Sequence, residues 1–140
     1  MVEINIEYQG ELRCRALHAP SSAVLVTDAP VDNHGRGESF SPTDLVATGL
    51  GTCMVTVMSI QARKLGFDLT GTRVQVNKQM TAQLPRRIAR LTVHVTFPSA
   101  ATASVAGARE AFERYAHECP VRLSLLGAIE VPVHFDWQRG

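Results

Sequence analysis

The chain has 140 residues, is 45% hydrophobic and 19% charged, and carries a formal net charge of +1 at pH 7. Its 14 basic and 13 acidic residues are spread along the sequence, which argues against a nucleic-acid partner and against a charged disordered tail. The same even charge favours a small or neutral substrate. The length and apolar content favour one domain, residues 1–140, with a substantial core.

The N-terminus and the cysteine count indicate a cytoplasmic protein. Three cysteines do not suit the disulfide framework of a small secreted fold, so we expect reduced thiols. Residues 1–9 alternate between polar and apolar, and no unbroken run of about 18 apolar residues occurs. We therefore expect no membrane partner.

The first third of the chain predicts an antiparallel meander of short strands, at Val2–Tyr8, Leu12–Leu17 and Ala23–Thr27. The segment from Asp28 to Ser41 is too polar to be a core element. It is expected to be a loop of about 14 residues, a length at which loops in compact domains are usually functional or mobile.

A long helix is predicted from Pro42 to about Lys64. Ser41 can accept a hydrogen bond from an unpaired N–H, Pro42 suits the first helical position, and Asp44 puts a carboxylate at the positive end of the helix dipole. Gly66 is expected to end the helix.

Apolar residues of this helix recur at three- and four-residue steps and predict one apolar stripe. The stripe contains Leu45, Val46, Gly49, Leu50, Cys53, Val57, Ile60 and Gln61. Cys53 is therefore expected to be buried or half-buried.

The second half of the chain predicts a hairpin, two helices and a closing strand. The elements are strands Leu69–Met80 and Ile88–Phe97, an amphipathic helix Ser99–His117 with Val105, Ala108, Phe112 and Tyr115 inward, a short helix from Pro120 through Leu126, and a strand Ile129–Trp137.

Two cysteines stand out because both lie in helical settings. Cys119 directly precedes Pro120 at a helix start, where the dipole and free N–H groups lower the pKa of a thiol. If the fold brings Cys53 and Cys119 together, one can attack a substrate and the other can resolve the product. Taken alone, Cys53 also suits a small hydrophobe in a helix core, and Cys14 on its strand is expected to be structural.

Other chemistries find less support. His117 and Cys119 could share a zinc ion, but no Cys-x-x-Cys or His-x-x-x-His accompanies them, so we expect no metal and no cofactor. The G-x-S-x-G motif of many hydrolases does not occur, so we do not expect a hydrolase.

An arginine is the group best suited to hold a thiolate ionised. Arg36, in the predicted loop, could fold over Cys53 and be oriented by Glu38 or Asp44. Two strand residues, Arg13 and Arg15, are alternatives.

Three segments taken together resemble the OsmC/Ohr family of thiol-dependent peroxidases. They are S-P-T-D-L-V-A-T-G-L-G-T-C, the following R-K-L-G-F-D-L, and H-E-C-P-V, whose cysteine stands 66 residues after the first. The resemblance covers nearly the whole chain. It implies an α+β fold of antiparallel sheets with a long central cysteine-bearing helix, in an intertwined homodimer with two active sites at the interface.

The resemblance also implies roles for site residues. Cys53 would attack the peroxide and become a sulfenic acid, Cys119 would condense with it to a disulfide, and an external dithiol would reduce that bond. Arg36 and Asp44 would assist as the cation and the acid. Where well-characterised family members read N-P-E-x-L, this chain reads S-P-T-D-L, with Thr43 at the glutamate position and Asp44 one residue later.

The leading expectation is a peroxidase for organic hydroperoxides, with an apolar wall for the alkyl group from Phe40, Leu50, Met54 and Met58. The alternative is a dimeric redox-sensing or ligand-binding protein with little peroxidase turnover. A third interpretation is a structural domain with inert cysteines. The natural peroxide and its reductant are left open.

Overall fold

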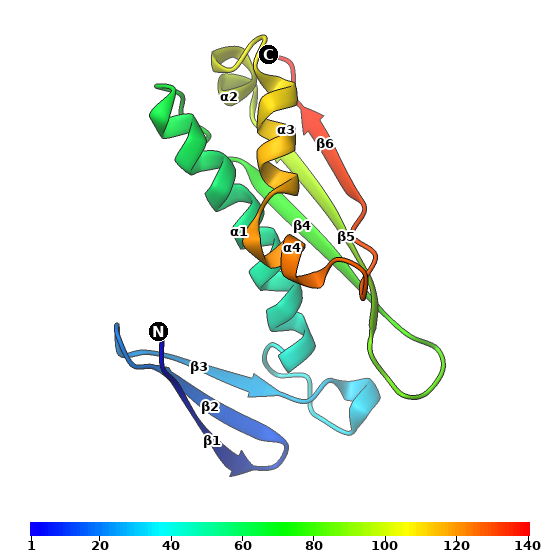
Figure 1. Ribbon diagram of the computed structural model, residues 1–140. Coiled ribbons are helices and arrows are strands. Elements are labelled where there is room, and N and C mark those ends of the chain that lie inside the picture. Colours follow the sequence, from blue (N-terminus) through cyan, green and yellow to red (C-terminus); the bar gives the residue numbers. More distant parts are fainter. The chain divides into compact units, whose positions relative to one another are not determined.

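The computed structural model describes residues 1–140, which form two compact units, 1–46 and 47–140, each with a three-stranded sheet (Figure 1). The elements are β1 (Ile4–Gly10), β2 (Arg13–His18), β3 (Ala23–Asp28), the 3-10 turn η1 (Val31–Asn33), α1 (Pro42–Lys64), β4 (Arg73–Met80), β5 (Ile88–Phe97), α2 (Ser99–Ser104), α3 (Arg109–His117), α4 (Pro120–Leu125) and β6 (Val133–Trp137). The predicted α+β class is confirmed, whereas a single domain stays a prediction.

The sheet of the first unit is the predicted meander, with β2 between β1 and β3. Ile6, Ala16 and Leu25 stand opposite one another across the three strands and so share one face. Ile4 and Tyr8 belong to the same face, and the large apolar side chains on it are 44–68% exposed. This unit therefore presents an uncovered apolar sheet face.

The polar segment after β3 is anchored at both ends. Asp28 and Ser41 are buried, and the expected loop begins one residue later than predicted because Asp28 is the last residue of β3. Asp28 Oδ2 accepts the N–H of Glu38, and Ser41 Oγ accepts the N–H of Asp44, which lowers the cost of burying these two residues. Between them, Gly35 lies so close to Ala29 that an added Cβ would stand 1.7 Å from its carbonyl oxygen.

Helix α1 has the predicted bounds because both of its caps form. The N–H of Ser41 donates to the Asp44 carboxylate at 2.8 Å, and the N–H of Asp44 donates back to Ser41 Oγ at 3.1 Å, a reciprocal cap. At the other end Gly66 takes φ +78°, and Phe67 donates to the Ala62 carbonyl at 2.8 Å.

The buried stripe of α1 is displaced from the predicted one. It consists of Ala47, Leu50, Gly51, Met54, Met58 and Ala62, while Ile60 is 48% exposed. Contact with β4 sets this rotation, since a Cβ on Gly51 would meet Val76 at 2.9 Å. By length and apolar composition alone α1 could cross a membrane, a test that core helices of soluble proteins also pass.

The sheet of the second unit pairs β5 antiparallel with β4 and parallel with β6. The predicted hairpin is confirmed, but β4 begins at Arg73 because Leu69–Thr72 forms a turn closed by the Thr72 N–H on the Leu69 carbonyl. The closing strand begins at Val133 rather than Ile129, whose N–H is bonded to the Leu125 carbonyl.

The predicted helix Ser99–His117 is two helices, α2 and α3. Gly107, at φ +86°, lies in the break between them, a conformation that favours glycine and does not continue a helix. Phe112 is buried, as predicted, and so is Val105. Figure 1 shows α1 and α3 over one face of the β4-β5-β6 sheet. Within this sheet Phe97 of β5 stacks on Trp137 of β6, with ring centroids 3.6 Å apart.

Candidate functional site: a pair of thiols

The structure brings Cys53 and Cys119 together. Cys53 is half-buried on α1, as predicted, and Cys119 is fully buried at the start of α4. Both thiols are free, and they lie close enough together that Cys53 affects the ionisation of Cys119. Neighbouring thiols can be joined as a disulfide where the backbone lets the sulfurs meet, which is the requirement for one to attack and the other to resolve.

Cys119 is held by the first turn of α4. Its Sγ accepts the N–H of Arg122 at 3.4 Å, its carbonyl accepts the N–H of Leu123 at 3.0 Å, and Pro120 occupies the first helical position. The sulfur therefore acts as the N-cap, a role more often taken by serine or aspartate.

The pKa of the Cys119 thiol is raised above its ordinary value, mainly because the group is buried, and the neighbouring Cys53 raises it further. The N–H groups of Arg122 and Val121 act in the opposite direction but do not overcome burial. The sequence predicted a lowered pKa for Cys119, and the net direction of that prediction is wrong. The N–H groups at the helix start do lower this pKa, as predicted, but burial raises it by more.

Arg122 is a charged neighbour of this site that sequence reasoning missed. Its Nη1 donates to the His117 carbonyl at 3.1 Å, and its Nε is buried without an acceptor among the protein's atoms. Its position three residues after Cys119, in C-P-V-R, was the available signal, because residues three apart share one side of a helical turn.

His117 is half-buried, with Arg122 and Glu113 close enough to affect its ionisation. Burial and the charge of Arg122 lower the pKa of its imidazole, and Glu113 opposes them. No group of three or more His, Cys, Asp or Glu side chains is placed to hold a metal ion. His117 instead packs edge-on against Phe135, with centroids 5.8 Å apart.

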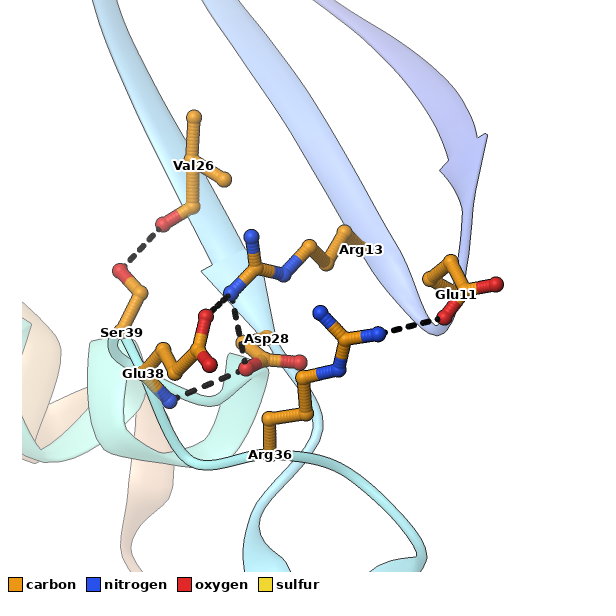
Figure 2. Close-up of polar contacts among 7 residues, drawn as sticks. All are labelled: Glu11, Arg13, Val26, Asp28, Arg36, Glu38 and Ser39. Carbon is orange, nitrogen blue, oxygen red and sulfur yellow. Dashed lines mark hydrogen bonds and ion pairs between the residues drawn. The ribbon is translucent and has the colours of Figure 1, made fainter.

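The predicted cation and acid lie in the 1–46 unit and have other partners. Arg36 donates to Glu11 at 3.0 Å, rather than to Glu38 or Asp44, and both side chains of this pair are mostly exposed (Figure 2). Glu38 binds Arg13 instead. The carboxylate of Asp44 caps α1.

Arg13 belongs to a charged cluster around the buried Asp28. Its guanidinium reaches both Glu38 and Asp28, and the N–H of Glu38 donates to Asp28 at 3.0 Å (Figure 2). The Glu38 N–H, more than Arg13, holds the pKa of Asp28 below its usual range against the effect of burial. Arg15 is exposed opposite Glu7 on β1.

The apolar wall predicted for an alkyl group is wrong for three of its four members. Leu50, Met54 and Met58 are completely buried against the rest of their unit, because they form the stripe that packs under the sheet. Phe40 is 54% exposed. A hollow of about 440 Å³ lies along the C-terminal half of α1, between Val55 and Thr72, and neither cysteine lines it.

A family model described as OsmC-like protein matches residues 35–134, which contain both thiols and the cap of α1. The chain belongs to the OsmC-like family. No curated protein matches it.

Solved structures of this family extend the likeness over the whole chain. An osmotic stress induced and detoxification response protein from Psychrobacter arcticus is 40% identical, with 96% of each chain covered and a TM-score of 0.85. An organic hydroperoxide resistance protein OsmC from Legionella pneumophila shares the fold at 17% identity, covering 97% of this chain and 96% of that one with a TM-score of 0.75. An organic hydroperoxide resistance protein from Elizabethkingia anophelis shares the fold at 14% identity. The match covers 99% of this chain and 96% of that one, with a TM-score of 0.76.

Proposed function

We propose that this OsmC-like protein is a thiol-dependent peroxidase that reduces organic hydroperoxides through Cys53 and Cys119. The observation that carries the proposal is the contact between the two thiols, one half-buried and one fully buried. Accessibility suits Cys53 to meet the substrate, and burial suits Cys119 to wait for the oxidised product. Relatives named for organic hydroperoxide resistance support the substrate class.

The proposed reaction has three steps. The Cys53 thiolate attacks the O–O bond, keeps one oxygen as a sulfenic acid, and releases the other as an alcohol after protonation. The Cys119 thiolate then attacks the Cys53 sulfur, so that an S–S bond forms, the S–O bond breaks and hydroxide leaves as water. An external dithiol reduces the disulfide and is itself oxidised.

A cation would aid the first step, since a peroxide O–O bond gains negative charge as it breaks. Arg36 stays our proposal for this cation, with Asp44 as the acid, and Arg13 and Arg15 are the alternatives. The exposed Arg36–Glu11 pair is weak enough to be exchanged for another partner at little cost.

We further propose a homodimer and a cytoplasmic location. Two surfaces favour a second copy of the chain: the apolar face of the β1-β2-β3 sheet, and the side of α1 that bears Gly49 and the exposed Ile60. A Cβ added to Gly49 would meet nothing within 4 Å, so this side of the helix has room for a close neighbour. Free thiols suit the reducing cytoplasm.

Redox sensing with little turnover is the second candidate, and the raised pKa of Cys119 favours it. A resolving thiol that is mostly protonated at neutral pH forms the disulfide slowly. Slow resolution would let oxidised Cys53 persist as a signal.

Measuring the steady-state consumption of peroxide distinguishes a peroxidase from a redox sensor. With dithiothreitol as reductant, the protein is expected to consume cumene hydroperoxide over many turnovers, faster than it consumes hydrogen peroxide. Consumption that stops after one equivalent per Cys53 would favour the sensor, and no consumption at all would contradict both.

A further inference from the structure

Arg122 joins the two helix ends on either side of Cys119. Helix α3 ends at His117, and α4 begins at Pro120, so Glu118 and Cys119 form the whole connection. The Arg122 side chain donates to the last carbonyl of α3 at 3.1 Å, while its backbone N–H donates to Cys119 Sγ at 3.4 Å. One residue therefore fixes both the connection and the sulfur that it carries.

The side-chain bond is favourable for a definite reason. The last carbonyls of a helix have no partners within it and carry partial negative charge, so a guanidinium there gains both a hydrogen bond and an interaction with the dipole. The Arg122 Nε finds no acceptor among the protein's atoms. The bond to His117 is thus the contact that places this guanidinium.

The attacking residue is built on a different element. Cys53 lies within α1, whose ends are fixed by their own caps and whose buried stripe packs under the sheet. Loosening the Glu118–Cys119 connection would move the resolving sulfur and leave the attacking one in place.

We propose that Arg122 is a positioning residue for disulfide formation: it holds Cys119 Sγ beside Cys53 so that it can attack the sulfenic acid. This inference rests on the proposed function. Displacement at sulfur requires the incoming sulfur to approach along one direction, so a small loss of alignment slows this step. Arg122 acts through Cys119, because its contacts are with the sulfur of that residue and with the His117 carbonyl.

The test is single-turnover oxidation with one equivalent of cumene hydroperoxide, in which dimedone traps the Cys53 sulfenic acid and mass spectrometry follows the disulfide. Arg122→Met removes the side-chain bond and keeps the backbone N–H on the sulfur. We expect sulfenic acid to form at the wild-type rate, disulfide to form about 10-fold more slowly, the effect of losing about one hydrogen bond, and trapped sulfenic acid to accumulate.

Two further variants make the result specific. Arg122→Lys keeps a charged donor and should recover most of the rate. Arg114→Met removes an exposed arginine from the preceding helix, α3, and should match the wild type. If Arg122→Met does not fold, Arg122→Gln takes its place, with slower disulfide formation again expected. Disulfide formation at the wild-type rate in the folded variant would overturn the proposal.

A second oxidant separates this inference from the proposed function. Diamide joins neighbouring thiols without a peroxide site. If the wild type ignores cumene hydroperoxide, the peroxidase proposal fails, and the rate with diamide still decides the role of Arg122. Slower closure in Arg122→Met supports the positioning role, and equal closure contradicts it.

Discussion

Each of the two compact units buries an ionisable group, and the pKa values of the two groups shift in opposite directions. In the 1–46 unit, Asp28 is fully buried and yet its pKa is lowered, chiefly by the Glu38 N–H and then by Arg13. In the 47–140 unit, Cys119 is equally buried and its pKa is raised. Burial alone therefore does not set the charge state. A carboxylate with strong donors stays ionised, whereas a sulfur with weak N–H contacts and a second thiol beside it stays neutral.

Our proposal puts both redox-active cysteines in the second unit, and replacing the attacking one, Cys53, tests it most severely. Cys53→Ser should reduce peroxide consumption by about 10³-fold or more, because no nucleophile remains to accept the oxygen. Cys14→Ser, a half-buried cysteine of the first unit, is the matched control and should retain consumption. The assay is peroxide loss with dithiothreitol, and equal losses in the two variants would remove the distinction.

Alkylation measures the neutral thiol directly. In Cys53→Ser protein, iodoacetamide should modify Cys119 at neutral pH several-fold more slowly than it modifies glutathione, because burial keeps the thiol protonated and covered. Since the pKa is raised, the rate should still be rising at a pH where the rate for glutathione has levelled off. A plateau at lower pH than glutathione would show that the N–H donors outweigh burial.

Substituting two glycines of α1, Gly51 and Gly49, tests how tightly the two sides of the helix are packed. Gly51→Ala should destabilise the 47–140 unit by about 1–3 kcal/mol, because its Cβ would overlap Val76 on β4. Gly49→Ala meets nothing within 4 Å in the chain and should raise helix stability by up to about 1 kcal/mol. Thermal unfolding measures both. If Gly49→Ala instead lowers stability in a concentration-dependent way, this side of α1 packs against a second copy.

The Asp28 carboxylate of the first unit should make the stability of the fold depend on pH in the acid range. The folded-state pKa of Asp28 lies below its unfolded value, so its contribution is fully present above the unfolded value of about 3.9 and is lost as the pH falls through the folded pKa. Asp28→Asn should lower the unfolding temperature at pH 7 and flatten this acid dependence. An unchanged melting profile between pH 6 and pH 3 would contradict the assignment.

The smallest effect is expected from the exposed pair in the same unit. Glu11→Gln removes the partner of Arg36 and should change stability by less than about 0.5 kcal/mol, because both side chains are mostly in water. Its effect on peroxide consumption is the more useful measurement. A faster reaction would support Arg36 as the cation, and a slower one would favour Arg13 or Arg15.

Elements with chemically explicit ends were predictable from the sequence. The bounds of α1 follow from the Ser41–Asp44 cap and Gly66, and β5 follows from clear alternation. The start of β4 was not predictable, because Leu69 continues the apolar pattern while its carbonyl closes a turn. The rotation of α1 depends on the approach of β4 at Gly51, which only the tertiary structure determines.

For the site, the sequence identifies the thiols but not their surroundings. Cys53 and Cys119 are recognisable from their helical settings, and they do meet. The raised pKa of Cys119 depends on burial, and a motif does not reveal how much of a helix start is covered. Arg122 escaped notice because its role comes from a bond to the preceding helix, across a connection whose geometry no local pattern specifies.

The central claim is that Cys53 and Cys119 act as one redox pair. The most direct measurement is mass mapping of disulfides after reduced protein meets one equivalent of cumene hydroperoxide. The account predicts one product, a Cys53–Cys119 disulfide within a chain, formed before any external dithiol is added. Thiols that remain unmodified, or a disulfide that links Cys14 instead, would contradict it.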